Sequence, residues 1–217
     1  NEDGFFKLQL MCDNYQLQYY TTPLSLEAGL RTQIQVPELT FSAPMLGKCS
    51  IKAGFDRNDG TNIDSISSTN FLVSDLIEII TEESLHSDPG KDIAILADAR
   101  KSSGEMVSKG EFSIKYRDYN FEGNITAGKL EHMLYIDANT EAGEYQIMIA
   151  ATDRYRNHGD KALKLEIPQI PTSIQNDIGN NVLAPGDTLK AKIALYDHTN
   201  KLINASSINV RVFDPYE

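Results

Sequence analysis

Apolar and polar residues alternate along most of this chain. Every second residue is apolar in residues 93–99, 112–116 and 189–195. A period of two places alternate side chains on one face of a β-strand. Glycine, proline and other turn-forming residues interrupt these runs about every 8–12 residues, as they do between the short strands of sandwiches and barrels. The pattern therefore predicts an all-β fold, with residues 74–83 as either a single helical turn or the first strand of a middle domain.

The alternating pattern also repeats, at a spacing of 96 residues. DPGKDIAILADARKSSGEMVSKGEFSIKYRD at 88–118 aligns without a gap to 184–214, which has the same proline-glycine opening, polar turn and final aspartate. The same spacing aligns GKCSIKAGFD at 47–56 with GEYQIMIAAT at 143–152. One spacing that serves two different segments predicts tandem domains.

These segments resemble the immunoglobulin-like β-sandwich repeats of bacterial and archaeal surface proteins, including macroglobulin-type and S-layer modules. The resemblance rests on the proline-glycine openings, the strand ending in VRVFDP and the stretch AGEYQIMIAATDRYRNHGD. It covers residues 74–217 well and residues 1–74 loosely. It implies tandem immunoglobulin-like sandwiches, each with two apolar inner faces around one core, and it implies no ligand. The chain has no tryptophan, which disfavours an antibody-type domain.

The register of the repeat predicts three units. Residues 71–168 form a complete sandwich, residues 1–70 a partial or divergent one, and residues 169–217 the first part of a further unit. Three arrangements fit this register. The chain is a piece of a longer array, or its two terminal parts combine into one sandwich, or a neighbouring chain adds the missing strands.

Composition limits the partners of the chain. Its 217 residues include 20 basic and 31 acidic ones, for a formal charge of −11. This charge repels phosphate backbones and anionic lipid headgroups, so we expect neither nucleic-acid binding nor membrane insertion. The longest apolar runs, Ile93–Ala97 and Ile147–Ala151, are far shorter than the roughly 20 residues that span a bilayer and predict buried strands. The start at NEDGFF, without methionine or an apolar leader, suggests a mature product or a fragment.

The two cysteines, Cys12 and Cys49, fall on the apolar faces of two alternating segments, FKLQLMC and CSIKAGF. We therefore predict that both thiols point into one core and form a disulfide between two sheets of a sandwich, with two buried free thiols as the alternative. Two N-glycosylation sequons, at Asn124 and Asn204, lie in or beside predicted loops, and Asn204 is the better candidate. A disulfide and sequons together favour an oxidising, extracellular location.

No motif in the chain predicts catalysis. There is no nucleophile elbow, P-loop or Rossmann glycine pattern, and neither cysteine has a histidine close in sequence. The histidines, His86, His132, His158 and His198, lack zinc-site spacing, and we expect them to be solvated in or next to loops. We therefore predict that the chain is not an enzyme and uses no cofactor.

The one stretch that suggests an ion is DRNDGTNID at 56–64, here called the acidic loop. Its alternating oxygen ligands and central glycine resemble the start of a calcium loop. The fifth position is Gly60 and the twelfth is Ser67, where carboxylates are expected, so a turn between two strands is the favoured interpretation. The calcium candidates are Asp56, Asn58, Asp59 and Asp64.

Two functions are compatible with these features. The first is a non-catalytic structural or assembly module of a cell-surface layer, filament or stalk, with other copies or neighbouring domains as partners. The alternative is a binding module, such as an adhesin or an accessory domain that recognises protein or carbohydrate. Tyrosines cluster in NYQLQYYTTP, at Tyr15, Tyr19 and Tyr20, where they provide aromatic surface for a glycan or, as we favour, pack along an edge strand.

Overall fold

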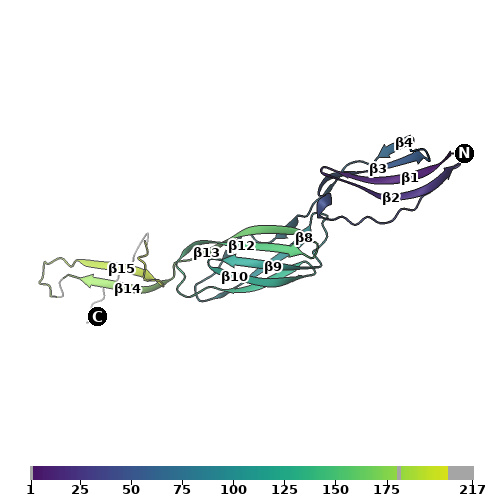
Figure 1. The fold of residues 1–217 in the computed structure, drawn as a ribbon. Helices are drawn as coiled ribbons and strands as arrows, with labels where there is room; N and C mark the ends of the chain where they lie inside the picture. Colours follow the sequence, from purple (N-terminus) through teal and green to yellow (C-terminus); the bar gives the residue numbers. More distant parts are fainter. Residues whose placement is uncertain (1, 180–181, 205–217) are drawn as a thin grey trace.

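The computed structural model describes residues 2–179 and 182–204. Three bodies of β-structure follow one another along an elongated molecule: a sheet at the N-terminal end, a sandwich in the middle and a hairpin towards the C-terminal end (Figure 1). The all-β expectation is confirmed, since the one helical element described is the short 3₁₀ turn η1 (Ala43–Met45). No helix of the described residues has the length and apolarity that a membrane crossing requires.

The N-terminal body is a five-stranded sheet of order β2-β1-β3-β4, in which β5 also pairs with β3. Its strands are β1 (Glu2–Cys12), β2 (Tyr15–Leu26), β3 (Gly47–Arg57), β4 (Asn62–Ser67) and β5 (Phe71–Val73). Its core is small, with Leu10, Met45 and Cys49 buried. Because β5 pairs with β3, residues 71–73 lie with this sheet, so the boundary expected after residue 70 moves to after Val73.

The middle body holds eight strands in the order β6-β8-β11-β10-β9-β12-β13-β7. They are β6 (Ile77–Ile80), β7 (Ser84–His86), β8 (Asp92–Lys101), β9 (Lys109–Tyr116), β10 (Tyr119–Thr126), β11 (Lys129–Tyr135), β12 (Gly143–Asp153) and β13 (His158–Ile167). A single residue pair, Thr126 with Lys129, joins β10 to β11. The ladder therefore divides there into two layers, which is the arrangement of a β-sandwich.

Side chains from both layers of the sandwich share one core. Ile95 and Leu130 come from one layer and Ile114 and Ile147 from the other, and all four are fully buried in a single cluster. Both apolar runs noted in the sequence lie in strands of this core, β8 and β12. The segment 74–83 contributes strand β6 rather than a helical turn, because alternate residues, Ile77 and Ile79, are buried.

The C-terminal body is an antiparallel hairpin of β14 (Pro171–Ile178) and β15 (Ala191–Asp197). In its register Ile174 lies opposite Leu195 and Ile178 lies opposite Ala191. The strand expected around VRVFDP lies outside the described residues.

Two hairpin turns that are 96 residues apart carry the same hydrogen bonds. Between β3 and β4, the Arg57 N–H donates to the Thr61 carbonyl at 2.9 Å. Between β12 and β13, the Asp153 N–H donates to the Asn157 carbonyl at 3.0 Å.

The strands β8 and β15 end in a second pair of matching turns. The Lys101 N–H donates to the Glu105 carbonyl at 2.8 Å, and the Asp197 N–H donates to the Lys201 carbonyl at 2.9 Å, again 96 residues on. The turns place Gly104 (φ 87°) and Asn200 (φ 62°) in the left-handed region, which glycine and asparagine tolerate better than other residues.

Candidate functional sites: the disulfide, the acidic loop and the joints

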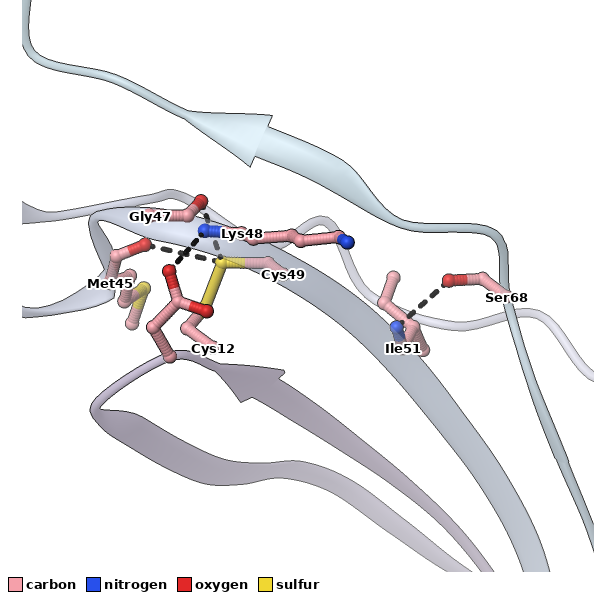
Figure 2. The surroundings of a disulfide bond; sticks show 8 residues. Cys12, Met45, Gly47, Lys48, Cys49, Ile51 and Ser68 are labelled. Atoms are coloured by element: carbon pink, nitrogen blue, oxygen red, sulfur yellow. Dashed lines mark hydrogen bonds between the residues drawn. A yellow bond between two sulfur atoms is a disulfide. The ribbon is translucent and has the colours of Figure 1, made fainter.

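The predicted pairing of Cys12 with Cys49 is present at one end of the N-terminal sheet, but the bond joins neighbouring strands of one sheet and not two sheets as expected. Cys12 of β1 and Cys49 of β3 are directly opposite partners in the ladder, and their sulfurs are bonded at 2.08 Å (Figure 2). Cys49 is 1% exposed and belongs to the small core of this sheet. The bond therefore links the two central strands within the small core of this sheet.

A carboxylate supports the same end of the sheet. Asp13, in the turn between β1 and β2, accepts a hydrogen bond from the Lys48 N–H at 2.9 Å. Gly47 has φ 107°, and a Cβ there would lie 2.6 Å from the Asp13 carboxylate. A side chain at this position would therefore both strain the backbone and displace Asp13. On the other side of the disulfide, the Ile51 N–H donates to the Ser68 hydroxyl at 2.9 Å (Figure 2).

The acidic loop forms the turn between β3 and β4, as the favoured interpretation expected. Asp56 at its start forms an ion pair with Lys7 of β1 at 2.6 Å and accepts a hydrogen bond from Asn62 at 2.8 Å. These two hydrogen bonds, first that of Lys7, hold the pKa of Asp56 below its ordinary value. The carboxylate most central to the calcium hypothesis thus already has a cationic partner.

The other calcium candidates have separate contacts. Asp59 accepts from the Thr61 N–H at 2.9 Å, and Asp64 accepts from the Ser65 N–H at 2.8 Å. Asn58 lies exposed in the turn. In the part of the chain that the structure describes, no three histidine, cysteine or acidic side chains gather as metal ligands. Calcium binding by the acidic loop stays a prediction.

The middle sandwich and the C-terminal hairpin meet at a joint of polar contacts. His198, in the turn after β15, places its Nε2 2.8 Å from the Thr140 carbonyl oxygen. In the same turn, the Lys201 ammonium lies 2.5 Å from the Glu141 carboxylate, and this hydrogen bond raises the pKa of Lys201. Thr140 is 2% exposed. The turn after β15 therefore packs against the loop that precedes β12.

The corresponding segments also meet at the joint between the N-terminal sheet and the middle sandwich. The turn after β8, residues 101–105, and the loop at residues 42–46 line one cavity of about 530 Å³. Residues 101–105 and 42–46 lie 96 positions before the turn and the loop that meet at the other joint. Equivalent segments thus lie together at both joints, but the joint between the N-terminal sheet and the sandwich also contains a cavity.

The lining of this hollow, here called the joint cavity, is aromatic and polar. Phe41 and Phe71 pack edge to face at 5.8 Å between ring centroids. Across the cavity, Lys101 lies over the ring of Tyr155 at 5.8 Å, and Tyr155 is 55% exposed. Arg156 and several hydroxyl side chains complete the wall.

The expectation of solvated loop histidines is wrong for His132. It lies within β11, half-buried, with its ring 4.7 Å from that of Phe121. Glu131 and His132 form a polar pair in the sequence, but alternation places His132 on the same face as the buried Leu130 and Leu134. His86 lies at the end of β7, His158 begins β13 and His198 occupies its turn.

The sequons differ in setting. Asn124 lies near the end of strand β10, beside the turn at residues 127–128, and it is paired with Glu111 of β9. Asn204 is exposed after the turn that follows β15, and Ser206 of its sequon lies outside the described residues. The tyrosine cluster lies on edge strand β2, where Tyr15 and Tyr19 pack against the small core, as favoured from the sequence.

The joint residues were missed in the sequence. His198 and Lys201 were read only as part of a polar turn, and Thr140 and Glu141 were not singled out. The repeat carried the one usable signal, because it aligns 42–46 with 138–142 and 101–105 with 197–201.

No protein family and no curated protein sequence matches this chain. Among solved structures it is similar to a 1.5-MDa bacterial ice-binding adhesin, studied for its retention at the host cell surface, with 8% identity and a TM-score of 0.32 over 83% of this chain. It is also similar to the chicken CNTN1 FN1–FN3 domains, with 8% identity and a TM-score of 0.27 over 89% of this chain and 71% of that one. The chain spans 60% of the adhesin chain.

Proposed function

We propose that this chain is a non-catalytic structural module of an extracellular layer, filament or stalk, built from immunoglobulin-like units that repeat about every 96 residues. The observation that carries the proposal is the recurrence of turns and joints at this spacing. A repeated contact between successive units transmits one fixed geometry along an array, which is the requirement for a spacer or a lattice component.

The joint between the sandwich and the C-terminal hairpin supports a defined orientation of the units. Two side chains of one turn, His198 and Lys201, contact two successive residues, Thr140 and Glu141, of the preceding unit. The ion pair is about half exposed at both ends, so solvent screens it and it adds little stability. The ion pair therefore contributes more to the orientation of the two units than to their stability.

An extracellular location is supported by the disulfide, because such bonds persist in oxidising compartments. The net charge of −11 suits a solvated surface on which neighbouring modules repel rather than aggregate.

The orientation can be tested by spin-label distance measurements across the joint. Labels at exposed positions 131 in β11 and 192 in β15 report on the sandwich and the hairpin. We expect a narrow distance distribution, broadened by Lys201→Glu and restored by adding Glu141→Lys. Lys190→Glu, the same charge reversal on an exposed residue of the hairpin unit, is the matched control. A broad distribution in the unaltered chain would overturn the proposal of a fixed joint.

Assembly is tested by light scattering over a concentration series, with intact mass spectrometry on the same sample. Growth into longer species with concentration supports a filament or lattice. A constant monomer mass limits the role to a spacer within one polypeptide.

The joint cavity favours the second candidate, a binding module. Its volume of about 530 Å³ is in the range of small-ligand sites, and such sites occur preferentially between domains. Exposed Tyr155 together with hydroxyl and amide groups suits a neutral sugar. A glycan-array screen of the unaltered chain and Tyr155→Ala tests this function, with Tyr135→Ala, an equally exposed tyrosine on β11, as control. Binding that only Tyr155→Ala abolishes would support it, and no binding would exclude it for the glycans presented.

A further inference from the structure

The sequon at Asn124 lies on the outward face of the sandwich. In β10 the residues Asn124 and Thr126 are exposed, whereas Ile125 between them is 1% exposed and belongs to the core. Alternation along the strand thus presents both chemically required side chains, the asparagine amide and the threonine hydroxyl, on one face. β10 pairs with β9 along its whole length, and only Thr126 at its end pairs with β11, so β10 lies at the edge of its layer.

The sheet surface beside Asn124 is hollowed. Small side chains account for it, because Ser113 of β9 pairs with Ala150 of β12 on this outward face. Glu111, Glu122 and Thr152 border the same depression, whose volume is about 440 Å³, and Asn124 forms part of its lining. Carboxylates and hydroxyls around a shallow, open floor are suited to hydrogen-bonding the hydroxyl groups of a sugar.

We propose that Asn124 carries an N-linked glycan whose first sugar lies in this depression. The glycan donor is a lipid-linked oligosaccharyl diphosphate. A bond forms between the Asn124 amide nitrogen and the anomeric carbon, and the bond from that carbon to the diphosphate oxygen breaks. The lipid diphosphate leaves with the electron pair and the amide nitrogen gives up one proton. The inference rests on the proposed extracellular location, because an exported chain encounters the lipid-linked donor during export.

The glycan would cover the outward side of β9, β10 and β12, where the side chains of Ser113 and Ala150 are small. A bulky, hydrated group on β10 keeps this face solvated while the ends of the units remain free for the joints.

The test is expression in a secreting host that performs N-glycosylation, followed by peptide mapping and intact mass. All variants carry Asn204→Gln, so that a single sequon remains. We expect a glycan on the peptide that contains Asn124, its loss in Asn124→Gln and in Thr126→Ala, and its retention in Thr126→Ser. Asn120→Gln, an exposed asparagine of the same strand outside any sequon, is the matched control and should leave the glycan in place.

A separate measurement tests whether the first sugar of the glycan lies in the depression. Enzymatic removal of the glycan should shift the backbone amide resonances of Ser113 and Ala150 and leave those of the distant β8 unchanged. An unmodified Asn124 in a host that modifies a reporter sequon would overturn the proposal, and unchanged resonances on glycan removal would refute the seating. The spin-label distances across the joint do not depend on the glycan, so failure of this inference is distinguishable from failure of the proposed function.

Discussion

Reduction of the Cys12–Cys49 disulfide should loosen the N-terminal sheet and leave the middle sandwich unaffected. The bond closes a loop with a sequence separation of 37 residues. In the chain-entropy treatment, a loop of 37 residues is worth about 3.8 kcal/mol at 25 °C. Because a tenfold change in an equilibrium corresponds to about 1.4 kcal/mol, opening of this sheet should become about 500-fold more frequent on reduction.

The effect should be local because the two bodies have separate cores. The N-terminal sheet buries a small cluster of Leu10, Met45 and Cys49, with Leu8 and Phe55 buried outside it, whereas the sandwich buries a larger continuous cluster drawn from both of its layers. A body with so little buried apolar surface relies on the covalent link, and the sandwich has no disulfide to lose.

Hydrogen–deuterium exchange with peptide resolution measures both bodies in one sample. Peptides from β1 and β3 should lose protection in reductant, and peptides from β9 and β12 serve as an internal reference. The double variant Cys12→Ala/Cys49→Ala should show the same loss without reductant and no further response to it. Loss of protection below tenfold in β1 and β3, or an equal loss in β9 and β12, would refute the loop-closure reasoning.

Three further outcomes are expected. Gly159→Ala should destabilise the sandwich by about 1–3 kcal/mol in urea unfolding, because its Cβ would lie 1.9 Å from the Ile77 carbonyl oxygen, whereas Gly179→Ala has no atom within 4 Å and should be near neutral. Lys7 lowers the pKa of Asp56 below 3.8, so the stability from this pair is present above pH 3.8 and lost as the pH falls through the lower folded value; Asp56→Asn should flatten that part of a stability–pH curve. Calcium added after chelation should leave the melting temperature unchanged, and a rise would show that the acidic loop binds the ion.

Local pattern was sufficient to predict the strands and the disulfide. Alternation shows which face of a strand is buried, and it can be read from the residues of that strand alone. The same alternation placed Cys12 and Cys49 on apolar faces, and the ladder of β1 and β3 then put them opposite each other. Residues 77–80 could not be assigned to a helical turn or a strand from the sequence, because four residues are too few to distinguish a helical period from a period of two.

The tertiary structure alone decided the settings of single polar side chains. Asn124 lies within a run of polar residues that is indistinguishable from a loop in sequence, and its place in β10 follows from pairing with β9. Asp56 meets Lys7, a residue 49 positions away, only because β1 and β3 are neighbours. His132 is half-buried because its ring packs against Phe121 of β10, a strand of the other layer.

The sequence by itself therefore determined the all-β class and the strand faces, including the apolar faces of Cys12 and Cys49, because these depend on side-chain periodicity along a single strand. The tertiary structure decided which loops meet at the joints, which carboxylate has a cationic partner and which sequon faces solvent on a sheet. Each of these depends on contacts between segments far apart in the chain, and no local pattern contains them.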